Sequence, residues 1–176
     1  KISLAFMRAW EPLSSTGEVD LMDVENVCKS MSQLFKFSCL LYDPHQAKLM
    51  AQRLVRFGVP ARELAFSTTN LTRMATTFLQ VVESGKLACY DEDGRLRRDF
   101  GKFNIVEKTY GFKLEAVSDE FGHADVGTAL VITLPTAVDM LNGVIFNSED
   151  EICNTEDVML SKEEVDDLPQ ELKDIY

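Results

Sequence analysis

The chain has 176 residues, of which 45% are hydrophobic, so it can form one domain of ordinary size with a substantial core. Its net charge of −11 is unevenly distributed, because residues 139–176 carry 12 acidic residues and 2 lysines, whereas residues 1–138 carry 17 acidic and 16 basic residues. A nearly neutral body with an acidic C-terminal end argues against a stand-alone nucleic-acid-binding module, which is usually basic.

The cysteines and the apolar segments indicate the compartment. The four cysteines form no C-x-x-C pair and no zinc-binding spacing with histidine. Cys28 and Cys39 fall within apolar patterns, which indicates buried free thiols in a reducing compartment. No apolar run reaches the roughly 18 residues of a membrane span, and no signal peptide is visible. We therefore expect a soluble, cytosolic protein with no membrane partner.

The first half of the chain alternates between strands and helices. A strand is expected over residues 2–10, and because it begins at the start of the sequence, we expect the chain to be N-terminally incomplete. The following elements are predicted to be a helix over 21–35, an interior strand over 38–43, a helix ending at Gly58, a short strand over 63–67, and a helix capped by Thr69 and Asn70. This order predicts an α/β fold with parallel strands and helices packed on the faces of the sheet.

The second half begins with a short strand over 86–90 and a basic helical turn over 95–102. Residues 104–110 and 112–118 alternate around Gly111 and predict a hairpin. A helix then begins at Asp125, and Pro135 is expected to kink or interrupt it. We expect residues 1–143 to form one domain and residues 144–176 to form an acidic, flexible or peripherally docked tail.

Asp43 is the first candidate site residue. It follows the apolar run that ends at Tyr42, and Pro44 opens a helix directly after it. In open α/β sheets, ligands bind at the carboxyl ends of the strands, so an aspartate there is a candidate for chemistry. Asp before Pro is also a common way to start a helix, so a capping role is the alternative. His45 lies at the same rim and ranks lower as a candidate.

Asp125 and His123 form the second candidate group, at the start of the late helix. The alternative is that Asp125 only stabilises the helix, because a negative charge in the first turn interacts favourably with the helix dipole. If Asp125 and Asp43 converge, however, their carboxylates stay ionised at neutral pH only when a cation joins them. Mg²⁺ and Mn²⁺ are the natural partners of such oxygen ligands. His123 would then be a ligand or a proton-transfer group at the edge of the metal site.

The basic residues near position 100 are candidates for phosphate binding. They are Arg95, Arg97, Arg98 and Lys102. A solvated basic face is the simplest interpretation, and contact with a nucleic-acid backbone near the catalytic edge is the functional one. The sequence contains no P-loop, no G-x-G-x-x-G and no G-x-S-x-G motif.

Several short motifs, taken in order, resemble one known family. They are Tyr42-Asp43-Pro44-His45-Gln46 with Gln52-Arg53-Leu54 and Gly58, then Asn70-Leu71-Thr72-Arg73-Met74-Ala75, then Ser84-Gly85-Lys86-Leu87, and finally His123-Ala124-Asp125 before Ala129-Leu130. Their order and spacing over residues 1–135 resemble the nuclease domain of the tailed-bacteriophage terminase large subunit. The resemblance implies an RNase H-like mixed sheet flanked by helices, with an acidic C-terminal tail.

The same resemblance implies a function. The domain would cut double-stranded, concatemeric DNA during viral genome packaging in the host cytoplasm, by hydrolysis with two Mg²⁺ or Mn²⁺ ions. Asp43 and Asp125 match two of the family's metal-binding acids, and His123 lies where some members place an extra metal-site residue. The portal and the small terminase subunit would be its protein partners.

One departure from the family pattern leaves an alternative open. The family carries a first catalytic aspartate on its first, central strand, and this sequence contains no match to that strand. The fragment could therefore be inactive, and the alternative function is an RNase H-like docking module with an incomplete metal site. A resolvase or exonuclease of the same fold is a further alternative, against which the Asn70–Ala75 helix start argues.

Overall fold

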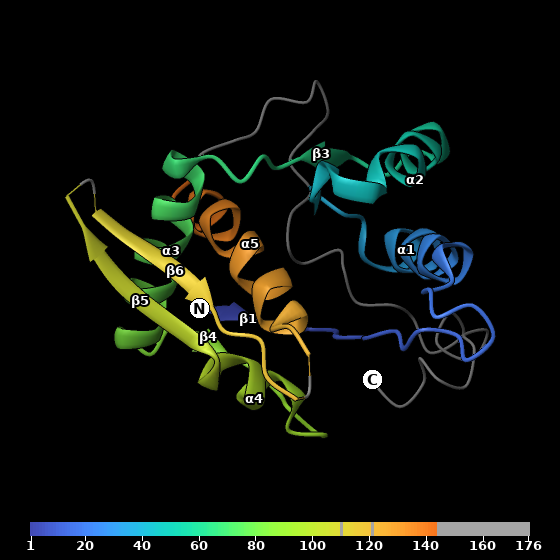
Figure 1. The fold of residues 1–176 in the computed structure, drawn as a ribbon. Coiled ribbons are helices and arrows are strands. Elements are labelled where there is room, and N and C mark those ends of the chain that lie inside the picture. Colours follow the sequence, from blue (N-terminus) through green and yellow to red (C-terminus); the bar gives the residue numbers. More distant parts are fainter. Residues whose placement is uncertain (110, 121, 144–176) are drawn as a thin grey trace.

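The computed structural model describes residues 1–109, 111–120 and 122–143, apart from the side chains of residues 45 and 46 (Figure 1). Over this part of the chain, five helices alternate with six short strands, so the predicted α/β class is confirmed. The acidic tail predicted for residues 144–176 lies outside the described residues.

The described strands form three sheets of two strands each. The strand β1 (Ile2–Ser3) is parallel to β4 (Leu87–Ala88), and β2 (Leu40–Tyr42) is parallel to β3 (Ala61–Glu63). The antiparallel hairpin consists of β5 (Phe103–Lys108) and β6 (Gly111–Ala116). The prediction of an interior strand at 38–43 is wrong for the described residues, because a strand is interior only when both edges are paired and β2 pairs with β3 alone.

One part of the molecule consists of β2, β3 and the two helices α1 (Leu21–Phe35) and α2 (Pro44–Phe57), which lie side by side (Figure 1). Asp20 caps α1, because its side chain accepts hydrogen bonds from the amides of Met22 and Asp23. The helix α2 ends before Gly58, whose φ of 101° suits a residue without Cβ. Met31, Ala51, Leu54 and Val59 are the buried apolar residues of this part.

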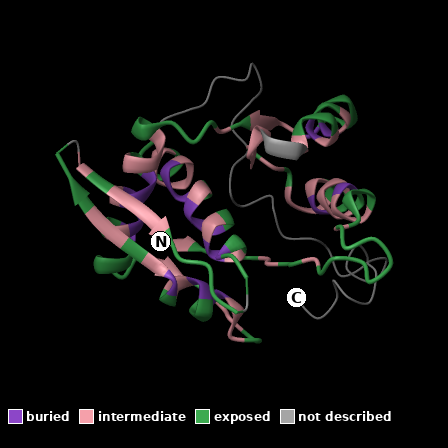
Figure 2. Cartoon of the chain, viewed as in Figure 1, coloured by how far each residue is buried: buried purple, intermediate pink, exposed green. Residues whose placement is uncertain are grey.

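The larger part contains α3 (Thr68–Glu83), α4 (Arg95–Gly101), α5 (Asp125–Leu141), the hairpin, and the pair of strands β1 and β4. Its core is where α3, α4 and α5 meet, and there the buried residues gather (Figure 2). The core residues are Met74, Phe78, Leu96, Leu130, Val131 and Leu134. The rings of Phe100 and Phe103 pack edge-on against Phe78 and fasten the start of β5 to α3.

Several predicted boundaries shift in the structure. The strand expected over 2–10 is limited to β1, because β4 offers only two residues for pairing. The expected strand at 63–67 is β3, two residues earlier. Ser67, not Thr69 or Asn70, caps α3, since the Ser67 hydroxyl accepts from the Asn70 amide.

Pro135 does not interrupt α5, which runs on to Leu141. Leu134 and Pro135 are both buried. We attribute the continuation to this packing, which offsets the hydrogen bond that proline cannot donate.

Candidate functional site

Asp43 lies directly after β2 and directly before Pro44, the first residue of α2, and it is half-buried. Because β2 and β3 are parallel, with Tyr42 opposite Glu63, their carboxyl ends share one edge. The amide of Leu64 donates to the carbonyl of Tyr42 and continues the pairing to that edge. The strand-then-helix setting predicted for Asp43 is therefore present, and it is compatible both with a site at the strand end and with a helix start.

Asp125 is the first residue of α5, and its side chain is exposed. The residue at the N-cap position is Ala124, which has no side-chain acceptor for the helix amides. Its exposure makes the carboxylate of Asp125 accessible from solution. His123, two residues earlier, is also exposed.

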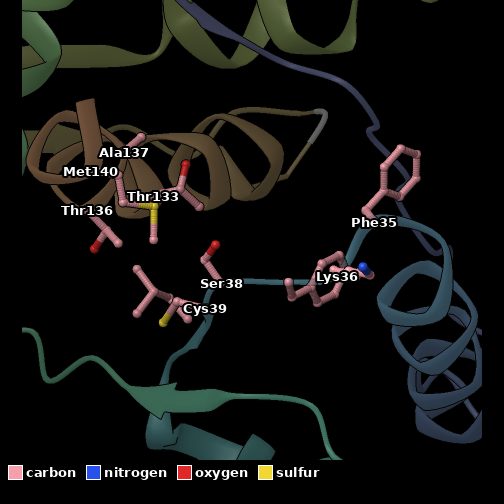
Figure 3. A pocket seen from close by; sticks show the side chains of 10 residues that line it. Phe35, Lys36, Ser38, Cys39, Thr133, Thr136, Ala137 and Met140 are labelled. Carbon is pink, nitrogen blue, oxygen red and sulfur yellow. The ribbon is translucent and has the colours of Figure 1, made fainter. Parts of the chain in front are cut away.

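The structure brings His123 and Asp125 together on one short segment, but Asp43 belongs to the other part of the molecule. The segment before and within β2 and the second half of α5 line one pocket, with Cys39 on one side and Thr133 on the other (Figure 3). Thr133 is eight residues beyond Asp125, which is about 12 Å along a helix. The pocket shared by these two elements is thus far from the end of α5 that carries Asp125.

The donor types of Asp43, Asp125 and His123 suit a hard divalent cation, but their arrangement does not complete a site. Within residues 1–109, 111–120 and 122–143, no group of three or more His, Cys, Asp or Glu side chains is arranged to hold a metal ion. The convergence of the two carboxylates therefore stays a prediction, and we derive no catalytic step through a metal.

The predicted basic cluster divides into two kinds of residue. Arg97 and Arg98 are exposed on α4, and Arg98 also donates to the carbonyl of Asp93 at 3.4 Å. Arg95 is less exposed and is engaged by Glu11 at 2.9 Å and by Asp93 at 3.3 Å. The ion pair with Glu11 raises the pKa of Arg95 further. Asp93 also accepts a hydrogen bond from the Arg95 amide, which lowers the pKa of that carboxyl.

Lys102 differs from Arg97 and Arg98 because it is buried. It is only 8% exposed, and its ammonium group lies 2.8 Å from Asp119 and 3.1 Å from the carbonyl of Gly122. Its charge is thus already balanced within the protein. A DNA contact by Lys102 stays a prediction, and its ammonium group would have to leave Asp119 and Gly122 to make one.

Asp99 is the residue near the site that the sequence reasoning missed. It is only 5% exposed, and its carboxylate accepts a hydrogen bond of 3.0 Å from the amide of Gly127, on the turn of α5 that begins with Asp125. The available signal was its position as the sole acid among Arg95, Arg97, Arg98 and Lys102, three residues before Lys102. Residues at that spacing face each other on a helix.

The pocket in Figure 3 has a volume of about 300 Å³ and a mostly apolar lining. Phe35, Leu41 and Met140 contribute apolar side chains, and Cys39 contributes a thiol whose pKa is raised by burial. None of the predicted site residues lines it. It therefore offers an apolar surface rather than a centre for acid–base chemistry.

No family model, curated protein or solved structure matches this chain. None of the described helices is both long enough and apolar enough to cross a membrane.

Proposed function

We propose that this chain is an RNase H-like nuclease domain of the tailed-bacteriophage terminase type, which cuts double-stranded DNA by metal-dependent hydrolysis. One observation carries the proposal: Asp43 follows a strand of a parallel pair and Asp125 opens the long late helix. Both positions are those that the ordered sequence motifs assign to acids of that family. The exposed carboxylate of Asp125 also supports the proposal, because a ligand can reach it.

In this proposal Asp43, Asp125 and His123 contribute ligands for Mg²⁺ or Mn²⁺. When bound, such an ion supplies an activated water and stabilises charge on the phosphate. The exposed guanidinium groups of Arg97 and Arg98 would contact the DNA backbone. The domain would act in the host cytoplasm on concatemeric DNA, together with the portal and the small terminase subunit.

The test is nicking of a supercoiled plasmid by the complete protein that contains this chain, with Mn²⁺, for the wild type and for Asp43→Asn and Asp125→Asn. Asparagine has nearly the same size as aspartate, and at position 43 it can also cap a helix, so both variants change the fold little while they weaken a metal ligand. The rate of cleavage should fall by about 100-fold or more. This loss is larger than the roughly 10–100-fold loss that is typical when a residue that only hydrogen-bonds to a metal ligand is replaced.

The matched control is Glu83→Gln, which removes an exposed carboxylate at the end of α3 and should leave cleavage unchanged. Wild-type cleavage by either aspartate variant would reduce that residue to a helix-start role and remove it from the site.

A second function is favoured by one specific observation, namely that no group of three metal-binding side chains is arranged for a metal ion in the described ranges. The domain would then be an RNase H-like docking module of the packaging assembly. In that case the complete wild-type protein would not nick the plasmid in Mn²⁺, while it would still bind DNA or the portal.

A further inference from the structure

Two buried charged residues, Asp99 near the end of α4 and Lys102 just beyond it, contact the segment that carries His123 and Asp125. Their side chains are 7% and 6% exposed, and their charged groups lie 3.9 Å apart. Burying a carboxylate and an ammonium is expensive unless each has further hydrogen-bond partners. In this structure, those partners are on the segment 119–127.

Asp99 supplies the cap that α5 lacks. A helix usually begins at a residue whose side-chain oxygen accepts a hydrogen bond from the amide two or three positions later. Ala124 cannot do so, and Gly127, three residues after it, donates instead to the carboxylate of Asp99 on α4. The close approach requires glycine, because a Cβ on residue 127 would lie 3.0 Å from Cβ of Asp99.

Lys102 holds the other end of the segment. Its ammonium group donates to the carbonyl of Gly122 at 3.1 Å and forms an ion pair with Asp119 at 2.8 Å. Asp119 and Gly122 are themselves joined by two backbone hydrogen bonds, of 3.0 and 3.2 Å. Asp119 and Gly122 are therefore both held to the end of α4 by one lysine.

We propose that Asp99 and Lys102 are positioning residues, which hold His123 and Asp125 in a defined orientation for a ligand bound at this end of α5. His123 and Asp125 lie between the two attachment points, Gly122 and Gly127, and both are exposed. The ligand role of His123 and Asp125 rests on the proposed nuclease function, whereas the attachment itself rests on the geometry.

The charged pair does more than fill space. Replacing a buried ion pair by apolar residues of similar volume is often neutral or stabilising, so stability alone gives no reason to bury Asp99 and Lys102. Their hydrogen bonds instead reach backbone groups on either side of the two candidate residues. Partners of this kind around a metal ligand typically change metal affinity or activity by 10–100-fold when they are removed.

The first measurement is amide hydrogen exchange by NMR on the 176-residue chain without metal. Asp99→Ala removes the acceptor of the Gly127 amide, and exchange over 122–127 should become about 10-fold faster or more. Asp99→Asn keeps an oxygen acceptor, so it should restore most of the protection. Lys102→Met keeps the length of the side chain and removes its donors, and it should accelerate exchange at Gly122.

Asp91→Ala is the matched control. Asp91 accepts hydrogen bonds from the amides of Leu96 and Arg97 at the other end of α4, so its loss weakens the same helix without touching the segment. If Asp91→Ala accelerates exchange over 122–127 as much as Asp99→Ala does, the effect is general loosening and the inference is overturned. Unchanged exchange in Asp99→Ala overturns it as well.

The second measurement is the Mn²⁺ concentration that gives half-maximal plasmid nicking by the complete protein. Asp99→Ala should raise it by about 10-fold, Asp99→Asn should stay near wild type, and Asp91→Ala should not shift it. An unshifted Mn²⁺ requirement in Asp99→Ala overturns the positioning role. If the wild type does not nick DNA at all, the nuclease proposal fails, and the exchange measurement still decides whether the attachment exists.

Discussion

Glu25 on α1 and Arg53 on α2 form an ion pair of 2.6 Å in which the carboxylate is almost completely buried. Lys29, one turn further along α1, binds the other carboxylate oxygen at 2.8 Å. The pair therefore joins the two helices of the β2–β3 part through a buried carboxylate, while the Arg53 side chain is 40% exposed. A charge held in this way makes the stability of the fold depend on pH.

The hydrogen bond from Lys29 and the burial of Glu25 act in opposite directions, and together with Arg53 they leave the pKa of Glu25 below its usual 4.5. A carboxyl with a lowered folded-state pKa contributes stability that is complete above its unfolded pKa and is lost as the pH falls through the folded value. We expect the melting temperature to fall from about pH 5 downward, and to fall less steeply in Glu25→Gln. Parallel pH profiles for the two proteins would contradict this expectation.

Leu54 should be a major contributor to stability. It is fully buried on α2, so Leu54→Ala should lower the free energy of unfolding by about 2–5 kcal/mol. Leu49 lies on the same helix and is 64% exposed, so Leu49→Ala should change it by no more than about 0.5 kcal/mol. Urea unfolding of both variants measures the difference, and equal losses would mean that α2 does not pack as described.

Gly127→Ala should destabilise the protein, although alanine favours helices over glycine by about 1 kcal/mol. The new Cβ would lie 2.9 Å from the ring of Phe103 and 3.0 Å from Cβ of Asp99, and such overpacking typically costs about 1–3 kcal/mol. A Cβ on Gly101, in α4, would meet no atom within 4 Å, so Gly101→Ala should be neutral or stabilising. Thermal unfolding of the two variants should show shifts of opposite sign or a clear difference in size.

The exposed arginines of α4 should contribute to DNA binding if the nuclease proposal holds. Each phosphate contact that Arg97→Gln or Arg98→Gln removes should decrease the slope of log K against log salt by about 0.9. Arg56→Gln, on the exposed last turn of α2, serves as the control. Salt titrations of duplex binding by fluorescence anisotropy would measure the slopes. Unchanged slopes in both α4 variants would exclude α4 from the phosphate contacts.

The sequence predicted the helices well because their signals are local. The apolar spacing over 21–35 and the Pro44 start and Gly58 stop of α2 correspond closely to α1 and α2. Strand length was harder to predict, because it depends on the partner. The apolar run from Ile2 predicted a long strand, but only Ile2 and Ser3 pair with Leu87 and Ala88.

In the candidate site, too, features set by neighbouring residues could be predicted, and features that depend on distant partners could not. The local settings of Asp43 and Asp125, after a strand and at a helix start, could be predicted from adjacent residues. The roles of Asp99 and Lys102 could not, because their partners Gly127 and Gly122 are 28 and 20 positions away. In the sequence a lysine beside three arginines predicts a solvated face, and only the tertiary fold shows that it is buried.

The division of the strands into separate pairs has a consequence for how the molecule opens. Residues 21–63 contain α1, β2, α2 and β3 in unbroken sequence, and the remaining described elements contact chiefly one another (Figure 1). Contiguous segments of this kind tend to unfold as cooperative units with their own free energies. Residues 21–63 can therefore open as one unit, with its own amide-exchange rate, while the core around Val131 and Leu134 stays closed. Only the connections at 4–20 and 64–67 join the two units along the chain. Within residues 1–143, the first proteolytic cut under native conditions should therefore fall in one of these connections or inside the unit that opens at lower free energy.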